Sequence, residues 1–127
     1  MAQEPLAELD NVLHIYDFRV KAGMGDEFIA LFNAFDYSDD NVMHASPAQV
    51  KDGVLCRDTE DPDRFYLVGE WRSVEEHMAI RKELIERTKG KRGFVSLIEG
   101  GKFAPNYGKV VSSTPAEVLQ RAAKKTS

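Results

Sequence analysis

The stretch Phe65-Tyr-Leu-Val-Gly-Glu-Trp-Arg-Ser-Val-Glu-Glu-His-Met-Ala-Ile80 is the most informative part of this chain, because it joins a strand directly to a helix. The part up to Trp71 is aromatic and apolar apart from one glycine and one glutamate, which is typical of a strand covered on both faces. Ser73 predicts a helix start, since its hydroxyl can accept a backbone N–H and a glutamate three residues later completes a capping box. We therefore expect Trp71 and His77 to lie close together, beside a pocket between strand and helix.

Before this stretch, the sequence predicts two further strands and a helix. Residues 12–20 alternate between two faces and predict the first strand, and the period changes to that of an amphipathic helix from Asp26. Its apolar stripe consists of Phe28, Leu31, Phe32 and Phe35. Residues 48–58 predict a second strand, which a bulge at Asp52-Gly53 interrupts. The turn Thr59-Glu-Asp-Pro-Asp63 then joins this strand to the next as a hairpin.

After the stretch, the pattern predicts a helix over residues 74–87, followed by a short helix over 94–99 and a last strand over 107–112. In the helix over residues 74–87, the side expected to face inward consists of Val74, His77, Met78, Arg81, Leu84 and Ile85. Thr114 followed by proline suits the cap of a further helix at the C-terminal end. We expect a tail over residues 1–10, one domain over 11–112 and a helical extension over 113–127.

Composition excludes several classes of function. A single domain of 127 residues is long enough to form a hydrophobic core without a structural metal. A net charge of -4 leaves no basic stripe for a phosphate backbone, so we expect no nucleic-acid partner. Cys56 is the only cysteine, which excludes an intramolecular disulfide and favours a reducing compartment. No apolar stretch is long enough for export or membrane spanning, so we expect a cytoplasmic protein with no membrane contact.

The order strand, helix, strand, strand, helix, strand is the split βαβ arrangement of ferredoxin-like α+β domains. Three segments, Val20–Phe28 in Val-Lys-Ala-Gly-Met-Gly-Asp-Glu-Phe, Arg57–Phe65 and Glu70–His77, resemble the antibiotic biosynthesis monooxygenase domain family, with a match over about residues 11 to 111. The resemblance implies a ferredoxin-like βαββαβ fold that forms a dimeric α/β barrel, here with an extra C-terminal helix. It also implies a homodimer that needs no cofactor, since in that family two sheets pair across a two-fold axis.

The resemblance points to three catalytic candidates. Some members of the family bind a polycyclic aromatic substrate against the tryptophan that Trp71 matches, although a large indole is also good core material. His77 stands where some quinone-forming members carry a tyrosine, and a partly buried imidazole can accept a phenolic proton. The alternative is a core histidine bonded to a backbone carbonyl. Arg81, one turn later, is placed to hold a carboxylate or an oxyanion unless its head group reaches the surface.

Candidate substrate-binding residues come from the first strand and the first helix. His14 and Tyr16 share one strand face and would supply polar groups if that face lines the cavity, or packing if it lines the barrel. Phe28 and Phe32 would form the apolar wall, or fill the cavity and leave a silent domain. The three histidines of the chain are far apart in sequence, so we expect no metal site.

These residues favour a cofactor-independent monooxygenase that uses dioxygen on a hydroquinone- or anthrone-like aromatic. Two alternatives stay open: a non-catalytic dimeric binding or structural domain, and an isomerase or degrader of a small polar metabolite. The anthrone-oxidising branch of the family carries an asparagine where this chain has Leu67, which weakens that substrate class. The haem-degrading branch uses an asparagine, a tryptophan and a histidine where Tyr16, a residue around Ile80, and Lys89 stand here, so haem chemistry is not expected.

Overall fold

The structure, a computed structural model, describes residues 1–89 and 91–126. Its centre is an antiparallel sheet with the strand order β2-β3-β1-β4. The strands are β1 (Val12–Arg19), β2 (Gln49–Arg57), β3 (Arg64–Trp71) and β4 (Asn106–Lys109). Because β3 lies between β1 and β2, which the first helix connects, the sheet has the expected ferredoxin-like topology.

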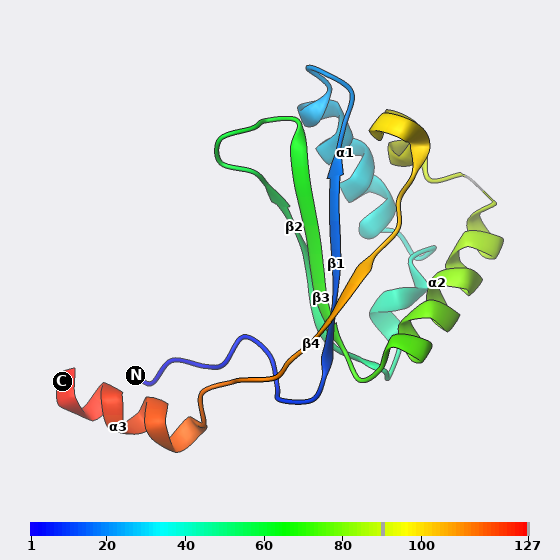
Figure 1. Cartoon of the computed structure of the whole chain (residues 1–127). Coiled ribbons are helices and arrows are strands. Elements are labelled where there is room, and N and C mark those ends of the chain that lie inside the picture. The colour runs from blue at the N-terminus through cyan, green and yellow to red at the C-terminus, as the bar shows by residue number, and fades with distance from the viewer. Residues whose placement is uncertain (90, 127) are drawn as a thin grey trace.

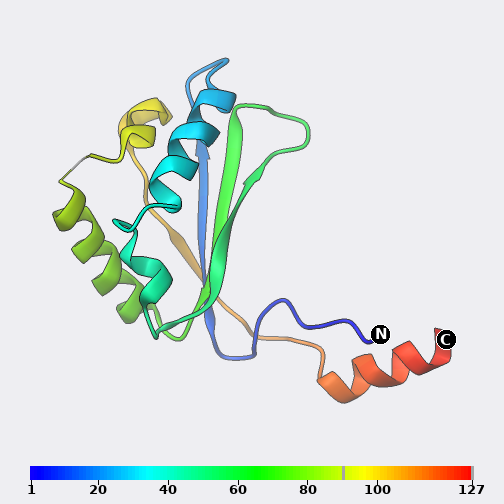
Figure 2. The same ribbon diagram turned by 180° about the vertical axis from the view of Figure 1, so that it is seen from behind.

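The helices α1 (Gly25–Asp36) and α2 (Val74–Thr88) lie on one and the same side of this sheet (Figures 1 and 2). Short 3₁₀ helices complete that layer: η1 (Val42–Ala45), η2 (Gly93–Leu97) and η3 (Glu99–Gly101). The start of α2 is as predicted, since the Ser73 hydroxyl accepts the backbone N–H of Glu76 at 3.2 Å and donates to its carboxylate at 3.0 Å. This reciprocal cap sets the direction in which α2 leaves β3.

The core between sheet and helices is largely aromatic. Its buried members are Tyr16, Phe18, Val20, Phe28, Phe32, Phe65, Phe94 and Ile98. Rings from α1 and η2 pack edge-on against one another, as in the pair Phe32 and Phe94 with centroids 5.2 Å apart. Two residues expected on inward faces are exposed instead: Leu31 by 36% and Met78 by 56%. Each lies at the margin of its helix's apolar arc, where the sheet no longer reaches it.

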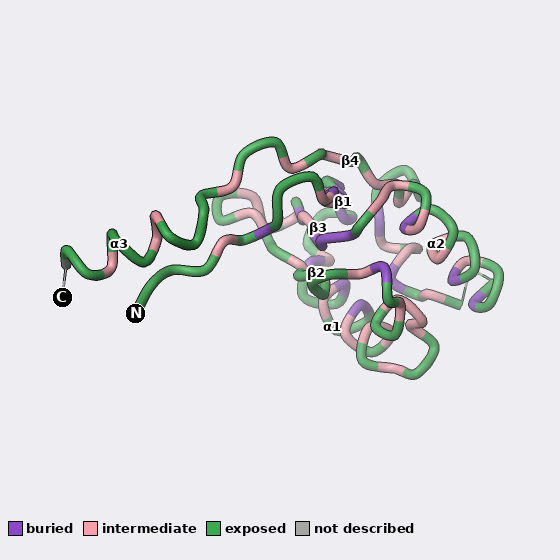
Figure 3. The backbone as a smooth tube through the Cα atoms, turned by 90° about the horizontal axis from the view of Figure 1, so that it is seen from below, coloured by how far each residue is buried: buried purple, intermediate pink, exposed green. Residues whose placement is uncertain are grey.

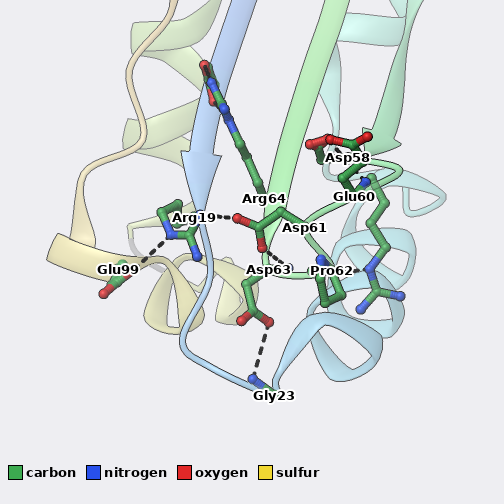
Figure 4. A network of polar contacts seen from close by, with 11 residues as sticks. Arg19, Gly23, Asp58, Glu60, Asp61, Pro62, Asp63, Arg64 and Glu99 are labelled. Carbon is green, nitrogen blue, oxygen red and sulfur yellow. Dashed lines mark hydrogen bonds and ion pairs between the residues drawn. The ribbon is translucent and has the colours of Figure 1, made fainter.

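The hairpin and the bulge are where the sequence predicts them. The register of β2 against β3 shifts between Gln49 and Val54, so the interruption falls at Asp52-Gly53. Polar contacts attach the hairpin turn to its neighbours (Figure 4). Arg19 pairs with Asp61 of the turn, and an Asp63 carboxylate oxygen accepts the backbone N–H of Gly23 at 3.2 Å. These exposed pairs hold the turn against the end of β1 and contribute little to stability.

The last strand is shorter than predicted. β4 ends at Lys109, whereas the sequence pattern indicated a strand over 107–112. Its partner β1 begins only at Val12, so beyond that point Val110 is left with two backbone hydrogen bonds, from Asp10 N–H and to Asn11 C=O. The chain then leaves the sheet and enters α3 (Ala116–Thr126), which projects away from the body beside the N-terminal segment (Figures 1 and 3).

The opposite face of the sheet carries no helix of the described residues, so within this chain β3 is covered on the helix side alone. Val54 in this face is 59% exposed, and Leu13, Ile15 and Val68 are partly exposed. Only one corner is covered: the Glu70 carboxylate is 2% exposed and accepts the Glu8 backbone N–H and the Asn11 side-chain amide, both at 2.8 Å. No helix in the described part of the chain has the length and apolar character needed to cross a membrane.

Gly69 tests how tightly β1 packs on β3. A Cβ added there would lie 2.7 Å from His14 Cε1 and 3.2 Å from Gly53 Cα, and the His14 ring is held by a hydrogen bond from Trp71. We expect Gly69→Ala to lower the free energy of unfolding by about 1–3 kcal/mol through overpacking, measured by urea denaturation. Gly93→Ala is the control, because no atom lies within 4 Å of its added Cβ. Equal losses in both variants would contradict this packing.

Candidate functional site

Three elements of the helix-covered side bring the predicted polar site residues together. His14 and Tyr16 come from β1, Trp71 from the end of β3, and His77 and Arg81 from α2. The His77 ring centroid lies 4.7 Å from that of Trp71 and 4.8 Å from that of His14. The strand-to-helix join therefore places Trp71 beside His77, as expected, and the face of β1 that carries His14 looks toward the helices.

The orientation of His14 is determined by Trp71. The indole Nε1–H of Trp71 donates to His14 Nδ1 at 2.8 Å, and an indole can only donate. The neutral imidazole therefore carries its proton on Nε2. That nitrogen is buried and has no hydrogen-bond partner among the described residues. Burial, and next the nearby His77, lower the pKa of His14 to about 3, so the ring is neutral at physiological pH.

His77 lies deeper and has a different partner. Its Nδ1 is 2.6 Å from the Tyr107 hydroxyl, and its side chain is fully buried. Burial, followed by the charge of Arg81, lowers the pKa of His77 to about 4. The sequence reading missed Tyr107. The ferredoxin-like strand order was the available signal, because β4 pairs with β1 and places Tyr107 directly opposite His14.

Arg81 points into the site and does not reach the surface as a free head group. Its Nη2 donates to the Phe103 backbone carbonyl, and its charge acts on the Tyr16 hydroxyl. Burial is the largest influence on Tyr16 and raises its pKa, while Arg81 opposes that rise. Tyr16 stacks on Phe103 with centroids 4.4 Å apart, so the segment before β4 closes this side of the site.

A cavity of about 50 Å³ lies in front of these groups. Its lining consists of His14, Tyr16, Phe32, Phe35, Asp36, Asn41, Met43, His44, Gln49, Asp52, Gly53, Leu67, Arg81, Leu84, Arg92, Phe94 and Phe103. Of the predicted site residues, Trp71, His77 and Phe28 are not in this lining. Trp71 and His77 lie behind His14, and Phe28 belongs to the aromatic core. The sequence reading also missed Arg92 of the loop before η2, where an irregular segment gives no periodic signal.

The end of the cavity between α1 and β2 is acidic. His44 of η1 bonds through Nδ1 to the Asp52 carboxylate at 2.9 Å and through Nε2 to the Asp36 carbonyl at 2.8 Å. Burial alone would lower the pKa of His44, but the bonds and charges of Asp36 and Asp52 outweigh it and raise the pKa. This cluster joins the end of α1 to the bulge of β2 across the cavity.

No metal-ligand cluster is found among the described residues. The described residues contain no group of three or more histidine, cysteine, aspartate or glutamate side chains with metal-binding geometry. The cavity has room for a few water molecules, far less than the ~300 Å³ or more of typical ligand pockets. Its contents in this conformation are therefore limited to a group of a few heavy atoms.

Several solved structures, of proteins with different names, have a similar fold. A protein named as an antibiotic biosynthesis monooxygenase, from Chloroflexus aurantiacus J-10-fl, is 20% identical with a TM-score of 0.54, covering 84% of this chain and 98% of that one. A mutant of SnoaB, a cofactor-independent oxygenase from Streptomyces nogalater, is 14% identical with a TM-score of 0.61 over the same shares. A dimeric ferredoxin-like protein from an uncultured marine organism is 21% identical with a TM-score of 0.60, covering 84% and 92%.

No protein-family model and no curated protein matches the sequence. The structural matches nevertheless confirm the ferredoxin-like α+β fold, and they include proteins named for the family that the sequence resembles. At these identities the likeness establishes the fold, and the chemistry of the site has to be argued from its own residues.

The buried histidines predict a loss of stability on mild acidification. Both folded-state pKa values lie below the value of about 6.5 of an unfolded chain, so only the unfolded state gains protons as the pH falls from about 6.5 toward 4. Their contribution is present above pH 6.5 and is lost on acidification. We expect His77→Gln to reduce the slope of unfolding free energy against pH in this window by about one proton, measured by urea unfolding at a series of pH values.

His44→Gln is the matched control for this prediction, with the opposite sign. Its pKa is raised in the folded state, so its contribution is present below about 6.5 and is lost as the pH rises through the folded-state value. Replacing it should make the slope more positive near neutrality. A wild-type slope that neither variant alters would contradict the assignment of neutral buried rings.

Proposed function

We propose that this protein is a cofactor-independent monooxygenase that acts on a small aromatic substrate of the hydroquinone or anthrone kind. The observation that carries the proposal is that His14, Tyr16 and Arg81 line one cavity, with the His14 tautomer set by Trp71. Two donors and a cation in a largely buried site are suited to stabilise a phenolate or enolate.

The anion that these groups stabilise is the reactive species. Once deprotonated, an electron-rich aromatic can give electrons to dioxygen directly, so the substrate serves as the reductant. An anthrone-like methylene loses two hydrogens and gains one oxygen atom to become a carbonyl, and the second oxygen atom leaves as water. The protein's part is to bind the substrate as its anion and to exclude water from it.

The geometry changes the roles that the sequence favoured. We assign substrate contact to His14 and Arg81, because both line the cavity. Trp71 and His77 become positioning residues: Trp71 fixes the His14 tautomer, and His77 packs behind the His14 ring while bonded to Tyr107. A proton acceptor role for His77 requires that the substrate reach past His14.

The small size of the cavity supports the two alternatives to an oxygenase. At about 50 Å³ it is too small for a polycyclic substrate in this conformation, which suits a non-catalytic domain or one that binds a small polar metabolite. An isomerase or degrader of such a metabolite would use the same polar lining. An aromatic ring can enter only if the wall formed by Phe35, Met43 and Phe103 moves.

We also propose that the protein is a homodimer formed through the open sheet face. Leu13, Ile15 and Val54 form an apolar area on this face that no helix covers, and such an area is costly in water. The solved protein of the same fold that is named as dimeric supports a dimer. The α3 helix and the N-terminal segment project from the same end of the sheet and are placed to clasp a partner (Figure 3).

Oxygen uptake by the metal-free protein tests the enzymatic proposal. With a panel of hydroquinones and anthrones, we expect uptake that falls about 100-fold in kcat/KM in His14→Gln, the range typical for loss of one oxyanion donor. His77→Gln should lose less, because His77 lies behind the cavity wall. A larger loss in His77→Gln would return the role of base to His77. The absence of oxygen uptake with every compound of the panel would contradict the oxygenase proposal.

Light scattering at micromolar concentration tests the dimer. We expect the mass of a dimer for the wild type and a monomer for Val54→Lys, which puts a charge into the open face. Met78→Lys is the control, because Met78 is 56% exposed but lies on α2, on the other side of the sheet. A wild-type monomer, or dissociation of both variants alike, would count against the open face as the interface.

A further inference from the structure

We propose that Arg81 and Arg92 form a carboxylate-binding subsite in the cavity, so that its ligand is an aromatic carboxylate. This inference rests on the proposed function only for the aromatic part of the ligand. The anion site itself stands on the charges, burial and unpaired donors of these residues.

The first argument is the absence of acidic partners. The ion pairs of the described residues give carboxylates to Arg19, Arg57, Arg64 and Arg72. None of these pairs includes Arg81 or Arg92, although both line the same partly buried cavity. A guanidinium is effectively always charged, so two positive charges share this site without an anion from the protein.

The second argument is the cost of that arrangement. Burial, and next the charge of Arg81, lower the pKa of Arg92, which means that the two guanidinium groups repel each other through a partly desolvated space. The acids of the cavity do not compensate them, since the carboxylates of Asp36 and Asp52 are paired with His44 at the other end. An anion between the arginines removes the repulsion.

The third argument is the supply of donors. The buried Nε of Arg92 and Nε2 of His14 have no hydrogen-bond partner among the described residues. An anionic acceptor satisfies Arg92 Nε, and His14 Nε2 is left for the phenolic oxygen of the proposed function. The arginines are also held in place, Arg81 by the Phe103 carbonyl and Arg92 over the Phe94 ring, with its guanidinium carbon 5.9 Å from the ring centroid.

The fourth argument is size. A carboxylate has three heavy atoms and fits a cavity of about 50 Å³, which has room for a few waters. Its planar pair of oxygens matches the donor fork of a guanidinium. The aromatic ring then contacts the apolar part of the lining, which includes Phe35 and Phe103.

The test measures binding without oxygen, so that it is independent of turnover. Trp71 is the only tryptophan and bonds to His14, which makes its fluorescence a reporter of the cavity. The probes are dihydroxybenzoate, its methyl ester and hydroquinone. We expect dihydroxybenzoate to bind at least tenfold more tightly than its methyl ester or hydroquinone. Added salt should weaken the binding of dihydroxybenzoate and leave the binding of the other two probes unchanged.

Variants locate the site. Arg92→Gln should weaken the binding of dihydroxybenzoate at least tenfold and leave the affinity for the ester unchanged. Arg92→Lys should recover part of this lost affinity. Arg87→Gln, on the exposed side of α2, should bind both probes as the wild type does. The unliganded Arg92→Gln protein should unfold at no lower urea concentration than wild type, because a repulsion has been removed. Equal affinity for acid and ester, or equal losses in Arg87→Gln and Arg92→Gln, would overturn the subsite.

Turnover separates the two proposals. Tight binding of dihydroxybenzoate without oxygen consumption in air would leave the carboxylate subsite standing and count against the oxygenase. Oxygen consumption that is equally efficient with hydroquinone and with dihydroxybenzoate would support the oxygenase and overturn the subsite.

Discussion

The hydrogen bond from Trp71 to His14 is the constraint on which the rest of the site depends. It links the two central strands on the side covered by the helices, and it needs the glycine at position 69 because the imidazole lies where a side chain would be. Since the indole can only donate, the bond also decides which nitrogen of His14 carries the proton. A packing contact between two strands thereby also determines the tautomer of His14.

Charge is distributed around the cavity in a definite order. The two buried histidines are neutral, because burial disfavours their charged forms. Arg81 and Arg92 make one side positive, and the cluster of His44 with Asp36 and Asp52 closes the other end. In a site with little water such fixed charges act strongly on a bound molecule, and they need no rearrangement when negative charge develops on it.

The sheet has two unlike faces, and each has a separate task. The face under α1 and α2 holds the aromatic core and the cavity, so it positions the polar site residues. The other face is open and apolar around Ile15, Val54 and Val68, carries the Asp17–Arg64 ion pair, and is covered at Glu70, where the N-terminal segment donates two hydrogen bonds to one carboxylate oxygen. Both termini leave from the same end of the sheet, so a partner on the open face would meet them too.

The sequence by itself determined the elements and their order. Three signals are local: the change of hydrophobic period near Asp26, the hairpin turn, and the helix cap at Ser73. Turn and cap chemistry act within a few residues, so the sequence alone reveals them. It also brought Trp71 and His77 together, since only a short turn separates them. Tertiary structure alone decided which residues meet at the site: Arg92 lines the cavity from an irregular segment, Tyr107 reaches His77 from β4, and His77 lies behind His14. Such assignments depend on strand register and on contacts between distant segments, which no local pattern encodes.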